Sequence, residues 1–255
     1  MIDTHIHIGR FYDVYYNPID ILRTVSEADV KRAEYSCTTS CDDNVRYKDV
    51  EKEIAEVTAY YSSDNITPFL WYIPSYIDEG VSAAGAFENL PYGGIKLHPR
   101  AHFWDLEDGK HLKCLHGLFA FAEERGLSVL IHTGEDDFER PCFFGRFFAE
   151  YPEVKCVLAH CRPVAETIEM FQRYENVSGD TAFLSKDSFK KIVRDGFSER
   201  LLPGSDFPIT HYFRTKYLQE RDGAITLREQ YFDDLKKMAE FVTKKEAKDN
   251  DNNCA

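Results

Sequence analysis

Eight short segments that are apolar or alternate apolar with polar residues recur along the chain, and a helix-like stretch follows each. Successive segments start about 22 to 35 residues apart, which leaves room for a strand, a loop and a crossover helix. Several prolines fall between the segments, where chain breakers are expected, namely Pro18, Pro91, Pro99, Pro152 and Pro163. The pattern therefore predicts eight βα units. The strand-like segments begin near Ile2, Ala33, Ile66, Gly93, Ser128, Val154, Asn176 and Leu201.

The predicted helices lie over residues 19–28, 43–61, 110–125, 164–174, 185–195 and 227–244, with a weaker helical pattern over 81–89. Eight βα units in about 250 residues match a (β/α)8 TIM barrel. An open doubly wound sheet usually has fewer strands, and no glycine-rich phosphate loop follows the first strand here. We therefore expect one α/β domain over residues 1–247 and a disordered C-terminal tail over 248–255.

The charge balance limits the partners of the protein. The chain has 31 basic and 44 acidic residues, a formal net charge of −13, and no basic patch that would attract a phosphate backbone. No segment reaches the roughly 18 apolar residues that cross a bilayer. The seven cysteines are scattered and resemble neither a disulfide framework nor a zinc motif. We expect a cytoplasmic protein with free thiols that acts on a small molecule, binds no nucleic acid or membrane, and could form a homo-oligomer.

The first strand carries two histidines on one face. Because side chains alternate along a strand, His5 and His7 point to the side opposite Ile6 and Ile8. In a barrel the polar face points inward, toward the carboxyl ends of the strands where barrel active sites lie. Neutral imidazole is the commonest protein ligand of divalent metals, although two hydrogen-bonded histidines without a metal would give the same spacing.

Further ionisable residues end other strands. Each follows an apolar run, so several such side chains converge on one rim of the predicted barrel. Buried ionisable groups must be paired or must bind a ligand, which favours a metal site. These residues are Lys96 and His98 in IKLHP, His132 in IHTGE, His160 in LAHC and Asp206 in GSDFP.

These motifs, together with DTHIH at residues 3–7, resemble in order and spacing those of the amidohydrolase superfamily, metal-dependent (β/α)8 enzymes. The similarity extends from Ile2 to Pro208 and is greatest to the amidohydrolase-2 branch, which contains hydrolases and non-oxidative decarboxylases. That branch lacks the small β-sandwich domain found elsewhere in the superfamily. The resemblance therefore implies a single barrel without an accessory β-sandwich domain.

The resemblance also implies roles for the rim residues. His5, His7, His132 and Asp206 would hold one divalent transition metal, Zn²⁺ ahead of Mn²⁺ or Fe²⁺. His160 would be a ligand in a site with two ions, or a catalytic and substrate-binding residue in a site with one. Asp206 would also act as general base toward water, whose pKa a divalent metal lowers to about 7.

Lys96 has two interpretations. In binuclear relatives a lysine near this position is carbamylated and bridges two metals. In the amidohydrolase-2 branch the equivalent lysine can remain an amine that holds a carboxylate. We expect the amine, facing the metal site and paired with an acid or an anion, while a purely structural ion pair with Asp3 or Asp180 stays open.

Three residues at the mouth of the site are candidates for substrate binding. His98 and Arg100 could bind an anionic group or simply pair with acids at the rim. Glu135 opens a segment rich in acids and phenylalanines, residues 135–148, which could line a pocket or pack in the core. The long segment 207–223 reads as a loop that carries specificity.

The function expected from these residues is hydrolysis of a C–N or C–O bond in a small, anionic substrate by metal-activated water. Non-oxidative decarboxylation is the first alternative, because it uses almost the same ligands. A TatD-like nuclease would carry a glutamate where this chain has Lys96, and the net charge opposes DNA binding. A barrel that binds ligand without catalysis is disfavoured, because none of the five motifs is missing.

Overall fold

The parallel strands begin within one residue of the positions that the hydrophobic pattern predicts. The structure is a computed structural model that describes residues 1–28, 30–41, 45–60, 65–217 and 225–252, with side chains up to residue 241. Of the strands described, β2 has no predicted counterpart, and it folds back antiparallel on the end of β1. The strands are β1 (Ile2–Phe11), β2 (Val14–Tyr16), β3 (Arg32–Cys37), β4 (Ile66–Trp71), β5 (Gly94–Leu97), β6 (Ser128–His132), β7 (Lys155–Ala159), β8 (Val177–Asp180) and β9 (Leu201–Leu202).

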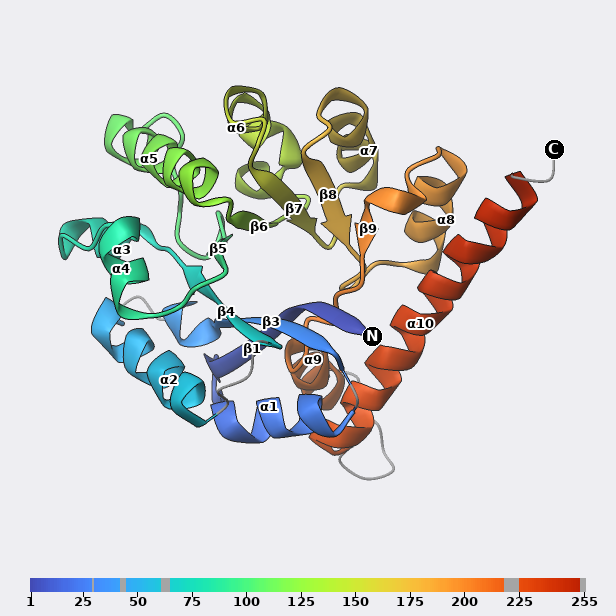
Figure 1. Ribbon diagram of the computed structural model, residues 1–255, viewed down its shortest axis with the longest axis horizontal. Coiled ribbons are helices and arrows are strands. Elements are labelled where there is room, and N and C mark those ends of the chain that lie inside the picture. Colours follow the sequence, from blue (N-terminus) through green and yellow to red (C-terminus); the bar gives the residue numbers. More distant parts are fainter. Residues whose placement is uncertain (29, 42–44, 61–64, 218–224, 253–255) are drawn as a thin grey trace.

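The strands form one curled sheet in the order β2-β1-β3-β4-β5-β6-β7-β8-β9, and all neighbours from β1 to β9 are parallel (Figure 1). Backbone hydrogen bonds connect β1 to the segment after β9. Thr4 N–H donates to the Pro203 carbonyl over 2.9 Å, and Asp206 N–H donates to the His5 carbonyl over 2.8 Å. The α/β class expected from the sequence is confirmed, and in place of the expected (β/α)8 barrel the structure shows a curled sheet that forms a half-barrel.

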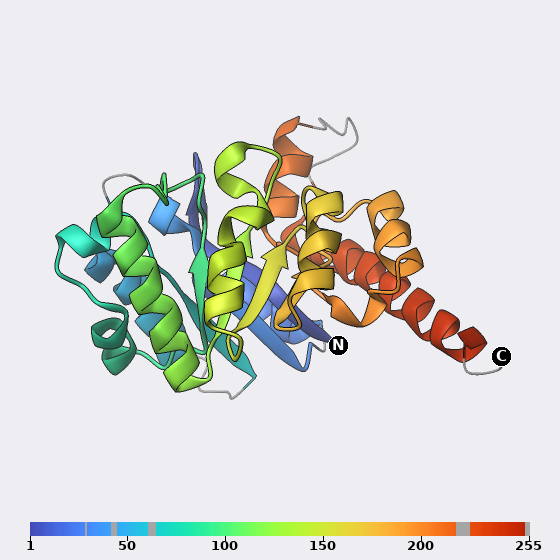
Figure 2. The ribbon, with the colours of Figure 1, turned by 90° about the horizontal axis from the view of Figure 1, so that it is seen from above.

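Helices cover the outside of the curled sheet, and α10 packs against α1 and α9 (Figures 1 and 2). Each predicted helix is present, whereas α3, α6 and α9 have no predicted counterpart. The predicted residues 43, 44 and 61 next to α2 lie outside the described residues. The helices are α1 (Pro18–Glu27), α2 (Tyr47–Tyr60), α3 (Pro74–Asp78), α4 (Ala83–Asn89), α5 (Gly109–Arg125), α6 (Gly145–Glu150), α7 (Val164–Arg173), α8 (Lys186–Arg194), α9 (Ile209–Tyr217) and α10 (Leu227–Asn252).

Capping residues set the limits of two of these helices. The Asn17 side chain accepts the backbone N–H groups of Ile19 and Asp20 at the start of α1. Asp108 caps the start of α5 in the same way, and Gly126 ends α5 with a φ of 64°, a left-handed conformation that favours glycine. These signals are local, which explains why the sequence places both helices within one or two residues.

The segment after β9 differs from its prediction. Residues 209–217 form α9 instead of a loop, and residues 218–224 lie outside the described residues. The N–H groups of Ile209 and Thr210 donate to the Asp206 carbonyl, which starts the helix. The sequence of α9 is rich in aromatic and β-branched residues with modest helix propensity, so tertiary packing decides its conformation. At the other end of the chain, α10 extends to Asn252, so the predicted tail over 248–255 overlaps the end of this helix.

The two faces of the curled sheet differ in polarity. The outer face joins the helices in one large apolar core, to which Ile6, Ile8 and Ile95 belong. Inside the sheet a small apolar cluster of Phe69, Leu130, Val157 and Ala159 fills the space at the level of Lys96. Several buried polar residues, among them His5, His7, Lys96, His160 and Asp206, lie toward the carboxyl ends of the strands. The apolar cluster inside the sheet therefore lies beneath the polar site.

Two further expectations concern the chain as a whole. Six of the seven cysteines lie in the described part, and all six are free thiols. Within the described residues, no helix combines the length and the apolar character needed to cross a membrane.

Candidate metal centre

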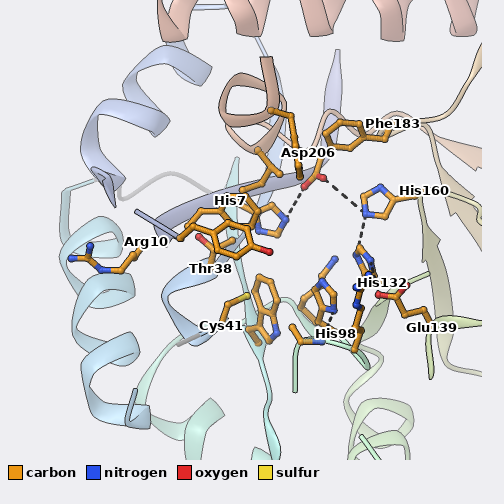
Figure 3. A pocket seen from close by; sticks show the side chains of 18 of the residues that line it. His7, Arg10, Thr38, Cys41, His98, His132, Glu139, His160, Phe183 and Asp206 are labelled. Atoms are coloured by element: carbon orange, nitrogen blue, oxygen red, sulfur yellow. Dashed lines mark hydrogen bonds and ion pairs between the residues drawn. The ribbon is translucent and has the colours of Figure 1, made fainter. Parts of the chain in front are cut away.

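Strands β1, β5, β6, β7 and β8 and the segment after β9 deliver imidazole, amine and carboxylate groups to the inside of the curled sheet, and Figure 3 shows His7, His132, His160 and Asp206 of this group. Their side chains are buried or nearly so, which requires each polar atom to have a partner. His5 and His7 come from β1, Lys96 from β5, His132 from β6, His160 from the end of β7, Asp180 from β8 and Asp206 from the segment after β9.

Three of these groups form a tight triangle of ligand atoms. His5 Nε2 lies 3.1 Å from His7 Nε2. Asp206 Oδ1 lies 2.9 Å from His7 Nε2 and 3.4 Å from His5 Nε2. This oxygen is buried and forms no hydrogen bond with any described group. The structure therefore brings together two imidazoles and a carboxylate, as expected from the sequence, around an unsatisfied oxygen.

The partners on the far side of each ring determine which nitrogens face inward without a proton. His5 Nδ1 donates to Asp180 Oδ2 over 2.7 Å, so His5 Nε2 carries a free lone pair. Ser36 Oγ lies 3.0 Å from His7 Nδ1, and a proton on that nitrogen leaves His7 Nε2 free as well. Burial, and then the charge of Lys96, lower the pKa of His5 well below its usual value, which keeps the ring neutral.

A second pair of imidazoles lies on the other side of Asp206. His160 Nδ1 donates to the Ala182 carbonyl over 3.1 Å, so His160 Nε2 is the acceptor nitrogen, and it lies 3.1 Å from His132 Nδ1. Asp206 Oδ2 lies 4.0 Å from His160 Nε2. His132 is thus near the triangle of His5, His7 and Asp206 without belonging to it.

The donor set fits a divalent transition metal. Lone pairs of His5, His7 and Asp206 face one another within 3.4 Å, and such a cluster of acceptors is repulsive unless a cation or proton lies between them. Imidazole nitrogen with carboxylate oxygen is a ligand combination that suits zinc and its neighbours. The carboxylate of Asp180 behind His5 is the type of outer partner that fixes a metal-binding histidine.

Burial and charge act in opposite directions on Asp206. Its burial would raise the pKa of the carboxyl group, but positive charge on His5 and His7 and a hydrogen bond from His7, which both need a proton between the rings and the carboxylate, outweigh this, so the pKa lies well below its usual range. Asp206 is therefore ionised at neutral pH. Its φ of 60° is rare for a residue other than glycine and turns the carboxylate toward the histidines.

The Lys96 side chain faces this site. Its Nζ lies 3.2 Å from His5 Nε2 and 5.7 Å from the centre of the Trp71 ring. Burial lowers its pKa to about 8, against the attraction of Asp206 and Asp180. No carboxylate of the described residues lies within 4 Å of Nζ, so the expected contact with an acid is replaced by a contact with a ligand histidine.

A cavity of about 1030 Å³ opens above the triangle (Figure 3). His7, Lys96, His132, His160 and Asp206 lie on its wall. Four cationic side chains face two acidic ones in this cavity, although the chain as a whole is strongly acidic. The cationic residues are Arg10, Lys96, Arg100 and Arg162, and the acidic residues are Glu139 and Asp206.

Comparison with known proteins gives a family that agrees with this geometry. The family model described as amidohydrolase matches residues 2–237, nearly the whole chain. The chain belongs to the amidohydrolase family. Among curated protein sequences, none matches this amidohydrolase.

Solved structures similar to this amidohydrolase share its fold at low sequence identity. A probable 2-pyrone-4,6-dicarboxylic acid hydrolase from Acinetobacter baumannii, with citric acid bound, superposes with a TM-score of 0.59 at 12% identity, covering 93% of this chain and 91% of that one. The phosphotriesterase homology protein from Escherichia coli, complexed with phosphate in its active site, gives 0.53 at 10% identity, covering 88% and 92%. An amidohydrolase from Mycoplasma synoviae gives 0.50 at 12% identity, covering 93% and 81%.

The candidate substrate residues of this amidohydrolase lie in different environments. His98 stacks on His132, with ring centres 3.7 Å apart, and accepts the Ala101 N–H. Arg100 lines the cavity, where it can meet a substrate, and it also pairs with the rim acid Asp136 over 3.1 Å. Its position is therefore compatible with substrate binding and with a simple ion pair.

Glu135 is exposed and lines only a side recess, whereas Glu139 is buried and reaches the site. Its Oε1 lies 3.4 Å from His132 Nε2. A Cβ atom at position 134 would lie 2.0 Å from Glu139 Oε2, so Gly134 is the residue that admits this carboxylate. The sequence offers no pattern that distinguishes Glu139 from the other acids of residues 135–139.

Arg162 is the second residue that the sequence did not single out. The backbone N–H of Arg162 donates to Thr133 Oγ1 over 3.1 Å, and the side chain of Arg162 lines both the cavity and the side recess. The Nε atom is buried and has no hydrogen-bond partner among the described residues. A buried guanidinium nitrogen without a partner suits an anionic group of a ligand.

Proposed function

We propose that this protein is a metal-dependent hydrolase that cleaves a C–N or C–O bond of a small, anionic substrate with activated water. The observation that carries this proposal is the buried triangle of His5 Nε2, His7 Nε2 and Asp206 Oδ1 at the bottom of a large cavity. Membership of the amidohydrolase family and the hydrolase-like fold support it.

In this proposal His5, His7 and Asp206 hold one divalent ion, Zn²⁺ ahead of Mn²⁺ or Fe²⁺, and His132 completes the ligand set from the adjacent pair. When bound, such an ion polarises a substrate carbonyl and lowers the pKa of water. His160 is the further ligand if two ions are present. Lys96 stays an unmodified amine, since its Nζ already contacts His5.

The remaining steps belong to residues of the chain. Asp206 accepts the proton of the attacking water, because it is ionised at neutral pH and its Oδ2 faces the cavity side of the site toward His160. His160 stays neutral, since burial lowers its pKa to about 3, and its Nε2 can accept a hydrogen bond from substrate or water. Lys96 Nζ supplies a hydrogen-bond donor beside the reacting atoms.

The cationic wall supports an anionic substrate. Arg162 and Arg100 lie on the same side of the cavity as His132, and Arg162 has a buried nitrogen free to donate. Of two proteins of similar fold, one has citric acid bound and the other has phosphate in its active site, which supports an anionic ligand.

We further propose that residues 1–247 act as one domain of the (β/α)8 barrel type. The hydrogen bonds from β1 to the segment after β9 and the continuous apolar core support this. The free thiols and acidic surface support a cytoplasmic enzyme that acts on small molecules, with no nucleic acid or membrane as partner. The state of assembly is open to a homo-oligomer.

A panel of substrates tests the reaction. Purified protein loaded with Zn²⁺ or Mn²⁺ is assayed against amides, lactones and aromatic carboxylates, with a His5→Ala, His7→Ala variant as control. Hydrolysis that disappears in the variant supports the proposal. Release of carbon dioxide from a carboxylate without hydrolysis would instead assign the protein to the decarboxylases. Equal activity in the variant would place the chemistry elsewhere.

A further inference from the structure

Residues in the left-handed backbone region cluster around the cavity. In the part of the chain that the structure describes, six residues other than glycine have a positive φ. Five of them line the cavity, and the sixth, Cys161, lies between the lining residues His160 and Arg162. Such a conformation is disfavoured for bulky side chains, so folding stability alone does not explain it. The five are Tyr12, Phe103, His160, Phe183 and Asp206.

Three of these left-handed residues are aromatic and exposed. Tyr12 is 73% exposed, Phe103 is 71% exposed and Phe183 is 43% exposed. The backbone at each position turns a large apolar ring toward the mouth of the cavity instead of into the core. Exposed apolar surface around a polar pocket is typical of a binding site, because a ligand can cover it.

Phe183 connects this aromatic mouth to the proposed metal centre. Its ring lies edge-on to the His160 ring, with centres 5.9 Å apart (Figure 3). Phe183 therefore lies directly beside the proposed metal centre. Tyr12 stacks on Tyr212 at 5.8 Å, which holds its ring in place at another part of the wall.

A side recess of about 130 Å³ is lined by charged side chains instead of aromatic ones. Arg100, Arg162 and His132 line it together with three acids, Glu135, Asp136 and Glu139, and no phenylalanine, tyrosine or tryptophan does. Arg100 already pairs with Asp136, whereas Arg162, which also lines the main cavity, has a guanidinium Nε without a hydrogen-bond partner among the described residues. The cavity thus has a charged side next to His132 and an aromatic mouth, with the reacting position between them.

We propose that the substrate is amphipathic: an anionic group pairs with Arg162 on the cavity wall, and an aryl or alkyl group extends outward between Tyr12, Phe103 and Phe183. This rests on the proposed function, because it takes the triangle as the reacting position. The volume of about 1030 Å³ lies at the upper end of ordinary ligand cavities, which a small acid alone would leave largely empty. The aromatic mouth selects the apolar group.

Binding of two carboxylate probes tests this inference. We expect the protein to bind biphenyl-4-carboxylate at least about tenfold more tightly than acetate in isothermal titration calorimetry. Phe103→Ala and Phe183→Ala together should remove most of that preference, and Phe183→Tyr should retain it. Phe143→Ala is the matched control, because Phe143 is 42% exposed and lies outside both cavities.

Equal affinity for the two probes would overturn the inference. A preference for biphenyl-4-carboxylate that persists in the Phe103→Ala, Phe183→Ala variant, while the Phe183→Tyr variant is folded, would also overturn it. The outcome is separable from the proposed function. Protein that binds metal and hydrolyses an amide or lactone without preferring the aryl probe refutes the aromatic mouth alone. Protein without metal or hydrolysis that still prefers biphenyl-4-carboxylate, and loses this preference in the double variant, refutes the hydrolase alone.

Discussion

His5 donates its Nδ1 proton to Asp180 across 2.7 Å, and both side chains are fully buried. The other carboxylate oxygen of Asp180 accepts the N–H groups of His160 and Ala182. Asp180 therefore fixes the tautomer of one imidazole and the backbone of another at the same time. This relationship explains why the acceptor nitrogen of His5 faces the centre.

Asp180→Asn should reverse that tautomer. The two backbone N–H groups keep an oxygen at Oδ1, so the new amide nitrogen faces His5 Nδ1 and donates to it, which puts the imidazole proton on Nε2. We expect affinity for Zn²⁺ to fall about 10- to 100-fold, measured by competition with a chelating dye. Asp187→Asn on the exposed side of α8 is the control. Unchanged affinity in Asp180→Asn would exclude His5 Nε2 as a ligand.

Asp206→Asn should abolish turnover while much of the metal stays bound. Asparagine keeps an oxygen for coordination but accepts no proton at neutral pH. A general base contributes about 10²- to 10⁴-fold, so kcat should fall by at least that much. The check combines steady-state kinetics with metal analysis of the same sample. Activity within about threefold of the wild type would rule out the role of Asp206 as base.

His160→Ala should also lower activity, because His160 Nε2 lies beside His132 and faces Asp206. With one ion in the site, the metal content of this variant stays near that of the wild type. Loss of half the metal on elemental analysis would show a site with two ions and contradict the single-ion proposal.

Arg162→Met should weaken the binding of an anionic ligand. The guanidinium has a buried nitrogen without a partner, and hydrogen bonds to charged groups contribute about 1.5–3 kcal/mol. We expect the Kd for malonate to rise about tenfold or more in calorimetry. Arg173→Met is the control, since Arg173 is exposed and pairs with Glu169. Equal malonate affinity in wild type and Arg162→Met would place the anion site elsewhere.

Asp234 should make stability depend on pH. It is buried in α10, accepts Thr210 Oγ1 over 2.6 Å and Gln230 Nε2 over 2.8 Å, and burial raises its pKa from 3.8 to about 6. A raised pKa in the folded state gives stability that is complete below about pH 4 and is lost as the pH rises through 6.

Asp234→Asn should therefore gain stability relative to the wild type as the pH rises from 4 to 7, by up to roughly 3 kcal/mol in urea unfolding. Asp233→Asn is the control, because a hydrogen bond from Arg214 lowers the pKa of Asp233, so its stability difference from the wild type should stay nearly constant from pH 4 to 7. If the free energies of unfolding of the wild type and Asp234→Asn differ by a constant amount over this pH range, the raised pKa of the buried Asp234 carboxyl group is contradicted.

The sequence predicts the strands well because buried parallel strands are short apolar runs between breakers. It also brings His5 and His7 together, since alternation along a strand is a local property. Asp206 and His160 follow strand ends, which places them at the rim, although the sequence does not show that left-handed backbone turns both inward.

The rest of the site depends on contacts between segments far apart in the chain. Glu139 reaches His132 because its loop folds back over Gly134, and Arg162 is placed by a hydrogen bond to Thr133. The aromatic mouth comes from three separate loops, around Tyr12, Phe103 and Phe183, whose conformations follow no periodic pattern. Periodicity cannot predict any of these positions, because loop backbone is set by tertiary packing.

The metal content of the protein tests the central claim most directly. Protein purified without chelator and analysed by inductively coupled plasma mass spectrometry should contain close to one divalent transition metal ion per chain. The His5→Ala, His7→Ala variant, folded by circular dichroism, should contain almost none. Wild-type protein that stays free of metal even after incubation with Zn²⁺ or Mn²⁺, or a variant with the same metal content as the wild type, would contradict a metal centre at His5, His7 and Asp206.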